Sequence, residues 1–464
     1  MWRLFYNIVL LVVSPVIVAV LLAKRRCRRG LLQRLGLQEG SSGLFGFFEQ
    51  KKLNKPDQPT KPDQPVIWVH AVSLGEVVAV TPLVNELHRR HPAYRLVVST
   101  VTETGREAVE HRLAGVADHC YAPLDFPWVV SRFIEGLQPC LYLFVETELW
   151  PNLLWHLCRR GVPTVLVNGR LSTRSYARQQ WAPVRSFYRT MLQTLSLCLM
   201  QSDRDVDRII ALGAEASRVR RTGNIKFDQP RLAITEGGTT RAHLGLEETE
   251  QLFVAGSTHP GEEETLVECY RSLATQYPSA VLLLAPRHIE RAESVEAMIR
   301  ARGLAVQRRS TIRQAGALRS TGPRVVVLDS RGELAAIYRE AVVAFVGGTL
   351  VPIGGHNLLE PAQWAKPVLF GPYTDHCAEI ADLLIQAGGG RRVLHGEDLT
   401  QQVMALFSND EERERMGRSA RQVVEQNQGA LQQTLEAIDR LLTPQQGTSG
   451  SPLADRPLPL MAGR

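Results

Sequence analysis

Apolar runs alternate with amphipathic segments along most of the chain. VIWVH (66–70), RLVVST (95–100) and TVLVNG (164–169) are short apolar runs, typical of strands that are buried on both faces. Between them, segments such as VVAVTPLVNELHRR (77–90) repeat apolar residues at the spacing of one helix face. Strands that alternate with helices in this way predict an α/β fold, with a parallel sheet covered by helices on both sides.

The same pattern restarts in the second half of the chain. QLFVAGS (251–257), AVLLLAP (280–286) and AVVAFVGG (341–348) have the character of buried strands, with helical segments between them. We therefore predict two doubly wound α/β domains of ordinary size, at residues 66–227 and 228–442.

The N-terminus carries an almost wholly apolar stretch at residues 4–23, and about 20 such residues suffice to cross a bilayer. Lys and Arg dominate residues 24–29, and positive charge beside a span tends to stay cytoplasmic. We therefore predict an uncleaved membrane anchor with its basic flank at residues 1–29, followed by cytoplasmic domains. A cleaved signal peptide is the alternative, but its charge would precede the apolar stretch and a small-residue cleavage site would follow it.

Two further segments are polar and carry no predicted core. Residues 30–65 form a membrane-proximal segment and a Pro-rich linker, in which KPDQP occurs twice. Residues 443–464 are rich in Gly, Ser and Pro, so we predict a disordered tail.

Composition narrows the function classes only slightly. The 464 residues are 44% hydrophobic and 22% charged, as in globular proteins, and the net charge of +7 fits nucleic acid, an anionic membrane or a phosphorylated substrate. The seven cysteines are scattered without a CxxC pair, which favours reduced thiols and argues against a zinc site. No residue pattern calls for a bound metal or a cofactor.

Carboxylates follow two of the predicted strands in the first half. Glu76 lies in HAVSLGEV just after VIWV, and Glu146 and Glu148 follow a strand in FVETELWP. Ligands of open α/β sheets bind at the carboxyl ends of strands, so Glu76 is a candidate general base. Gly75 could let the backbone approach a ligand or adopt a positive φ. The structural alternative is that these acids simply complement helix dipoles.

Other candidates are Lys226 in GNIKFD, a weak signal by itself, and Arg287 in APRH, which is well placed for a phosphate. The run GGTLVPIGGHNLLEP (347–361) pairs glycines around a loop whose amides could hold an anion, and Glu360 could bind ribose hydroxyls. This run is neither a Walker loop nor GxGxxG. Asp203-Arg204-Asp205 could pass for a metal-binding DxD, but an N-cap followed by first-turn acids explains it better.

Together HAVSLGE, FVETELWPNLL, NGRLS, GNIKFD, APRH and GGTLVPIGGHNLLEPA resemble the 3-deoxy-D-manno-octulosonic acid (Kdo) transferases of lipopolysaccharide biosynthesis. The resemblance extends from the N-terminus to about residue 442. It implies a GT-B glycosyltransferase, with two Rossmann-like domains facing a cleft and an N-terminal anchor helix at the inner membrane. It also implies inverting transfer of Kdo from CMP-Kdo to a lipid A precursor at the inner leaflet, with no cofactor and no nucleic-acid partner.

The resemblance also implies roles for individual residues. Glu76 would be the general base, and Glu146 and Lys226 would stabilise the transition state. The CMP-binding residues would be Pro286, Arg287, Arg331, Gly332, Glu333, Asn357, Leu358, Leu359 and Glu360.

The residue pattern alone selects Glu76, Arg287 and the GGHNLLE loop, but it undervalues Lys226 and does not select residues 331–333. Arg331 stands where relatives usually carry methionine, which puts a side-chain contact at that position in doubt. The alternatives are another GT-B-like nucleotide-sugar transferase or epimerase, and a non-catalytic membrane-tethered nucleotide-binding protein. No motif indicates how many Kdo residues are added, which acceptor acylation is preferred, or the oligomeric state.

Overall fold

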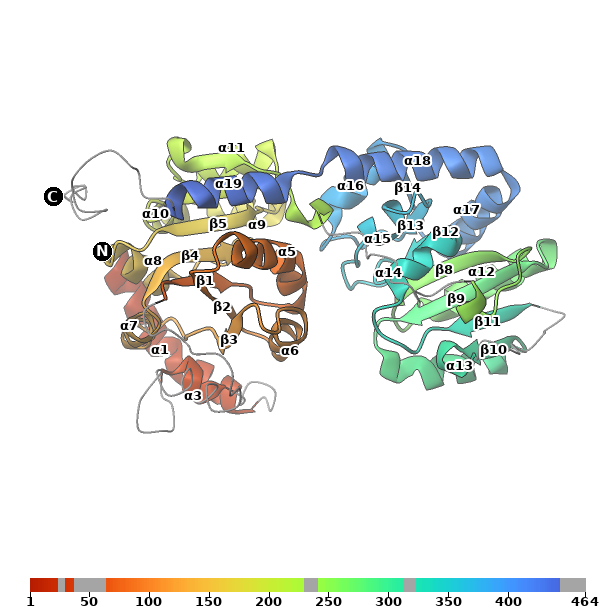
Figure 1. Ribbon diagram of the computed structural model, residues 1–464, viewed down its shortest axis with the longest axis horizontal. Coiled ribbons are helices and arrows are strands. Elements are labelled where there is room, and N and C mark those ends of the chain that lie inside the picture. Colours follow the sequence, from red (N-terminus) through yellow and green to blue (C-terminus); the bar gives the residue numbers. More distant parts are fainter. Residues whose placement is uncertain (24–29, 37–63, 229–240, 313–322, 443–464) are drawn as a thin grey trace. The chain divides into compact units, whose positions relative to one another are not determined.

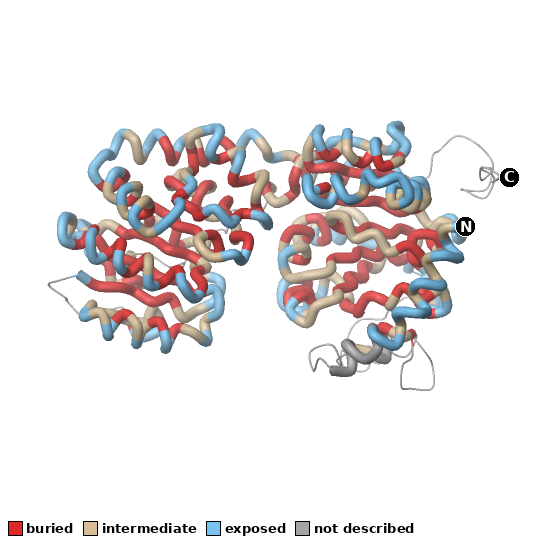
Figure 2. Tube along the Cα trace, turned by 180° about the vertical axis from the view of Figure 1, so that it is seen from behind, coloured by how far each residue is buried: buried red, intermediate tan, exposed pale blue. Residues whose placement is uncertain are grey.

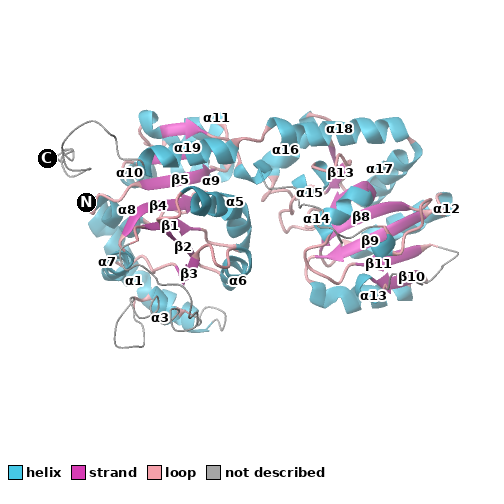
Figure 3. Cartoon of the chain, viewed as in Figure 1, coloured by secondary structure: helices cyan, strands magenta, loops and turns pink. Residues whose placement is uncertain are grey.

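The computed structural model describes residues 1–23, 30–36, 64–228, 241–312 and 323–442 (Figure 1). The chain divides into two compact units, the first made of residues 1–229 with 428–464 and the second of residues 230–427. Each unit contains one sheet of seven parallel strands, with helices on both of its faces (Figure 3). This confirms the predicted α/β class with two parallel sheets.

The sheet of the first unit has the strand order β3-β2-β1-β4-β5-β6-β7. The strands are β1 (Val66–His70), β2 (Arg95–Thr100), β3 (Asp118–Tyr121), β4 (Pro139–Val145), β5 (Thr164–Gly169), β6 (Leu197–Met200) and β7 (Val219–Arg221). The central strands are buried almost throughout, which explains why their sequences are continuously apolar (Figure 2).

The helices of the first unit separate onto the two faces of its sheet, each face with its own core. On one face lie α7 (Pro127–Leu137), α8 (Pro151–Arg159), α10 (Ala182–Leu192) and α11 (Asp203–Ala211). On the other lie α5 (Leu74–Arg90), α6 (Glu103–Arg112) and α19 (Ala430–Leu442). Shorter elements are α3 (Leu31–Arg34), α9 (Thr173–Gln179), η2 (Ala216–Arg218) and η3 (Ile225–Asp228).

Helix α19 differs from the sequence expectation, which placed residues up to 442 in the second domain. Its apolar face, including Leu435 and Ile438, is buried in the core that α5 and α6 form with the first sheet. The carboxylate of Asp228 accepts hydrogen bonds from the backbone N–H groups of Gly429 and Leu431, and so caps the start of this helix. The chain therefore returns to the first unit to complete its core.

The sheet of the second unit has the order β10-β11-β9-β8-β12-β13-β14. Its strands are β8 (Gln251–Thr258), β9 (Ala280–Pro286), β10 (Ala305–Arg308), β11 (Arg324–Val327), β12 (Ala341–Val346), β13 (Val368–Phe370) and β14 (Gly390–Arg392). Its helices are α12 (Glu263–Gln276), α13 (Ala292–Ala301), α14 (Leu334–Ile337), α15 (Leu359–Ala362), α16 (Ala378–Gln386), α17 (Gly396–Ser408) and α18 (Asp410–Gln426). Single 3₁₀ turns are η4 (Ala242–Leu244), η5 (Ile289–Arg291), η6 (Arg309–Thr311) and η7 (Tyr338–Glu340).

Helix α1 (Trp2–Ala23) contains the apolar stretch and packs by its first turns on the first unit. Tyr6 donates a hydrogen bond to the buried carboxylate of Asp125 at 2.9 Å, and Asn7 pairs with Asn152. Burial raises the pKa of Asp125 to about 6, while the N–H groups of Asn152 and Leu153 at the start of α8 oppose the shift. The first turns of α1 are thus attached to the domain through buried polar groups.

The outer side of α1 is apolar and uncovered, with Leu4, Leu11 and Val12 exposed by 64–71%. Within the part of the chain that the structure describes, no helix combines the length and the apolarity that a membrane span requires. The predicted membrane anchor therefore stays a prediction. Its basic flank, residues 37–63 of segment 30–65 and the tail 443–464 lie outside the described residues.

Candidate active site

Glu76 lies in the first turn of α5, directly after β1 ends. Its half-buried carboxylate accepts hydrogen bonds from the Val72 N–H at 2.8 Å and the Ser73 hydroxyl at 3.0 Å. Burial raises the pKa of Glu76 to about 7; the bond from Val72 opposes the shift, and the charges of Glu146 and Glu148 add to it. A carboxylate with a pKa near neutrality can accept a proton at working pH and release it afterwards.

Gly75, next to this carboxylate, has space around it. Its φ is not positive, so the first of two expectations, that Gly75 lets the turn adopt a positive φ, is wrong. A Cβ built on Gly75 would meet no described atom within 4 Å, and the residue is exposed. The open surface beside Glu76 is compatible with the other expectation, that a ligand approaches the backbone here.

Glu146 and Lys226 form an ion pair, with 3.2 Å between Oε1 and Nζ. Glu146 directly follows β4 and has a φ of 57°, a left-handed conformation that costs a non-glycine residue energy and recurs at functional sites. Lys226 sits in η3, and its backbone N–H is held by the side-chain oxygen of Asn224. The structure thus brings together two residues that are 80 positions apart in the sequence, beside the strand end that carries Glu76.

Glu148 belongs to the same group of acids. Burial raises its pKa, and the charge of Glu146 adds to the shift. Three carboxylates therefore follow β1 and β4, which are neighbours in the sheet, with one ammonium group among them. The pKa of Glu76 and that of Glu148 are both raised within this cluster, and perturbed carboxylates of this kind are frequent at sites of proton transfer.

In the second unit, the first glycine pair of the loop after β12 does not present its amides to a ligand. The carboxylate of Glu262, which is 0% exposed, accepts N–H bonds from Gly348, Thr349 and Leu350, and a fourth from His259, all at 2.8–3.0 Å. The expectation that these amides hold an external anion is therefore wrong for this half of the loop.

The loop is also tightly packed against β8. A Cβ on Gly347 would lie 2.5 Å from the backbone oxygen of Ser257, so only glycine fits there. The sequence pattern did not identify Glu262. The run GEEE (261–264) places three acidic residues at the start of a helix, where any of them would complement the helix dipole, and their spacing does not show which one is buried.

The second half of the loop carries His356 and the proposed nucleotide-binding residues. His356 and His259 stack with nearly parallel rings and share a hydrogen bond of 2.8 Å between their Nε2 atoms. Burial, and after it the positive charge of Arg287, lower the pKa of His356 to about 3. Both rings are neutral at neutral pH, since burial also lowers the pKa of His259, so one ring donates and the other accepts.

The residues proposed for CMP gather at the ends of three strands in this unit. Pro286 ends β9, and the exposed Arg287 follows it. Asn357 accepts the N–H of Leu359 and donates to the carboxylate of Glu360, which organises the start of α15, while Leu358 is buried beneath.

The residues after β11 complete this edge of the sheet. Arg331 forms an exposed ion pair with Glu290 at 3.2 Å, which links the loops after β11 and β9. Glu333 is held by Arg309 and Ser330, and Gly332 has a φ of 86° in an open turn. The exposed side chain of Arg331 thus lies at the edge of the sheet that carries Arg287, although the pattern alone did not select it.

The DxD-like stretch has a structural role. Ser202 caps α11 by accepting the N–H of Asp205, whose buried carboxylate accepts the N–H of Leu171. Among the described residues, no group of three or more His, Cys, Asp and Glu side chains has the arrangement of a metal site.

The fold itself has known relatives. Each of the two units has one parallel sheet of seven strands with helices on both faces, and solved structures share this two-unit arrangement. The UDP-GlcNAc 2-epimerase from Neisseria meningitidis is similar over 81% of this chain and 100% of its own, with a TM-score of 0.56 and 12% identity. The glycosyltransferase of kitacinnamycin is similar over 82% of this chain and 100% of its own, with a TM-score of 0.53 and 16% identity. At these identities the likeness concerns the fold alone.

Sequence comparison gives the family. The family model of 3-deoxy-D-manno-octulosonic-acid transferase (kdotransferase) matches residues 43–229. The 3-deoxy-D-manno-octulosonic acid transferase of Haemophilus influenzae is 35% identical over 447 residues, covering 94% of this chain and 98% of its own. That of Bordetella pertussis is 34% identical over 385 residues, covering 80% and 86%. The chain belongs to the Kdo transferase family and is a glycosyltransferase.

Proposed function

We propose that the protein transfers Kdo from CMP-Kdo to a phosphorylated lipid A precursor with inversion of configuration, and that Glu76 is the general base. The observation that carries the proposal is the raised pKa of Glu76, a half-buried carboxylate at a strand end beside open space. Its oxygens are held by Val72 and Ser73, so the group has a fixed orientation. In this scheme Glu76 accepts the proton of the acceptor hydroxyl as its oxygen attacks the anomeric carbon.

The ion pair of Glu146 and Lys226 acts on the charge that develops during the reaction. As the bond from Kdo to CMP breaks, the anomeric centre becomes cation-like, and the carboxylate of Glu146 favours that charge. Lys226 compensates the carboxylate in the resting protein, and its cation can stabilise negative charge that grows on the departing phosphate. Both side chains are only partly exposed, which strengthens their fields relative to those of surface charges.

The second unit would bind the CMP group through Pro286 and Arg287, through residues 331–333, and through residues 357–360. Arg287 has the geometry for a phosphate, because a guanidinium offers a fork of N–H donors. Glu360, held by Asn357, can accept ribose hydroxyls.

We place the protein at the cytoplasmic side of the inner membrane, attached by α1. Support comes from the uncovered apolar side of α1 and from the basic residues 24–29 that follow it in the sequence. Attachment would hold the first unit where a lipid acceptor is concentrated.

The test is an assay of the full chain in detergent with CMP-Kdo and a tetraacyl disaccharide bisphosphate. We expect acceptor-dependent CMP release and, by mass spectrometry, a lipid that carries Kdo. Glu76→Gln should reduce the rate by about 10²–10⁴-fold, which is the usual contribution of a general base. Glu107→Gln, at an exposed carboxylate of α6, is the matched control and should retain the rate. No Kdo-bearing lipid from the unmodified chain would sink the proposed acceptor, and full activity of Glu76→Gln would sink the proposed base.

A further inference from the structure

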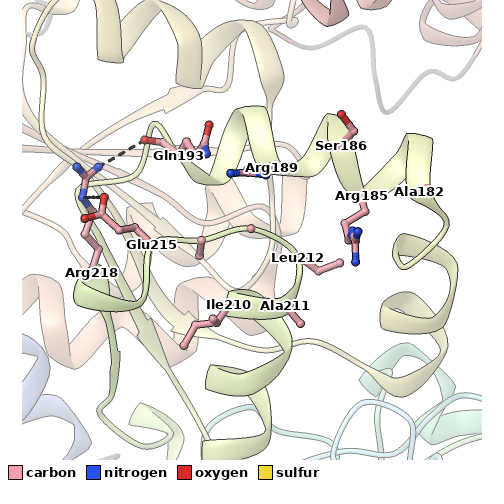
Figure 4. Close-up of a pocket in the computed structure, with 12 residues that line it drawn as sticks. Ala182, Arg185, Ser186, Arg189, Gln193, Ile210, Ala211, Leu212, Glu215 and Arg218 are labelled. Carbon is pink, nitrogen blue, oxygen red and sulfur yellow. Dashed lines mark hydrogen bonds and ion pairs between the residues drawn. The ribbon is translucent and has the colours of Figure 1, made fainter. Parts of the chain in front are cut away.

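A groove of about 820 Å³ lies in the first unit between α10 and the turn that follows α11 (Figure 4). Three arginines line it, Arg185, Arg189 and Arg218, with Glu215 as the single lining carboxylate. The site residues of the first unit, Glu76 included, lie elsewhere, since none of them lines this groove.

The three arginines differ in what holds them. Arg218 forms an ion pair with Glu215 at 2.9 Å and donates to the backbone oxygen of Leu195 at 3.1 Å, so its charge is compensated. Arg185 and Arg189 have no carboxylate partner among the described residues. They are four positions apart on α10, which puts both on the same side of the helix. In Figure 4 the side chain of Arg185 extends from α10 toward Leu212.

Gly213 brings the turn close to Arg189. Its φ is 112°, and a Cβ there would lie 2.6 Å from Cγ of Arg189. The stem of Arg189 therefore packs on the turn, which restricts where its guanidinium can go. The groove is thus a hollow with two uncompensated guanidinium groups, one of them held in place by packing, and such groups match the oxygens of a phosphate.

The groove adjoins the first turn of α1, at Trp2, on the side of the helix that packs on the first unit. Trp2 donates from its indole nitrogen to the hydroxyl of Ser186, a lining residue, at 3.0 Å, and its ring contacts Phe187. Trp181, at the N-cap of α10, is 67% exposed. A cationic hollow beside an exposed tryptophan and an uncovered apolar helix matches a phospholipid, whose charged headgroup is joined to acyl chains.

We propose that this groove binds the phosphate of an anionic phospholipid headgroup, with Arg185 and Arg189 as its ligands and the acyl chains lying along α1. The inference rests on the proposed membrane attachment and adds to it a specific headgroup site. It would add the attraction of two further arginines to that of the apolar side of α1 and of the basic residues 24–29.

The experiment measures binding of the full chain to vesicles of phosphatidylcholine, with and without phosphatidylglycerol. Each arginine at an anionic surface contributes about 1 kcal/mol, so Arg185→Gln with Arg189→Gln should weaken binding to the anionic vesicles about thirty-fold. Binding to pure phosphatidylcholine, which depends on α1, should not change.

The matched control replaces Arg174 and Arg178, two exposed arginines of α9 outside the groove, by glutamine. This control variant removes the same charge, and its affinity for the anionic vesicles should fall by less than about fivefold, which is the contribution of one arginine. If the two double variants lost the same affinity for anionic vesicles, diffuse electrostatic attraction would explain the binding and the headgroup site would be overturned. Unchanged affinity in Arg185→Gln with Arg189→Gln would overturn it as well. If the unmodified chain bound neither kind of vesicle, the membrane attachment itself would fail, while the transferase assay would still report on the reaction.

Discussion

Replacing Glu262 by glutamine tests whether a buried carboxylate organises the loop after β12, which we propose to bind the nucleotide. The carboxylate accepts four N–H bonds, from His259 and from residues 348–350. An amide of the same shape keeps one acceptor oxygen and turns an NH₂ group toward the other two donors. Two buried donors then lose their partner, at about 1–3 kcal/mol each, so we expect the loop to be destabilised by about 2–6 kcal/mol.

The loop leads directly into His356 and into residues 357–360, which we propose to bind CMP. The predicted effect of the substitution is therefore a lower affinity for CMP. Calorimetry of the full chain should show weaker CMP binding for Glu262→Gln, together with a lower melting temperature. Glu264→Gln, two residues further along at an exposed position of α12, should change neither property. CMP affinity unchanged in Glu262→Gln would refute the reasoning, because it would mean that the loop keeps its shape without the four bonds.

The remaining predictions concern the environment of Glu76. Ser73→Ala removes a hydrogen bond that lowers the pKa of Glu76, so the rise of kcat/KM should move to higher pH, whereas Glu148→Gln removes a negative charge and should move it to lower pH. Shifts in the same direction, measured as pH–rate profiles, would contradict the assignment. Lys226→Gln leaves Glu146 without its ion-pair partner and should lower kcat at least tenfold. The melting temperature should change little, because a partly exposed ion pair contributes only about 0–1 kcal/mol to stability. An unchanged kcat would exclude Lys226 from the reaction.

Periodicity predicted the sheets well, because strands covered on both faces need continuous apolar sequence, and that signal is local. It also led to Glu76, since the carboxyl end of a strand can be located from the strand itself. The ion pair of Glu146 and Lys226 could not be predicted in this way, because it joins segments 80 residues apart and depends on how strands are ordered in the sheet.

Two of the errors have a common physical cause. The glycine loop looked like an anion site, but an internal carboxylate, Glu262, already satisfies its first amides. Helix α19 looked like part of the second domain, but its apolar face is buried in the first. In both cases the structure depends on a partner that is distant in the sequence, and the local sequence pattern does not show which residue or core that partner is.

The central claim is that the carboxylate of Glu76 accepts the proton of the acceptor hydroxyl. The pH dependence of kcat/KM for acceptor-dependent CMP release tests it most directly, because the pKa of Glu76 lies near 7, well above that of an ordinary carboxyl. The account predicts a rate that rises through about pH 7 in the unmodified chain, and a slow, flat profile over that range in Glu76→Gln. A Glu76→Gln profile that still rises through the same pH would assign the proton to another group and contradict the account.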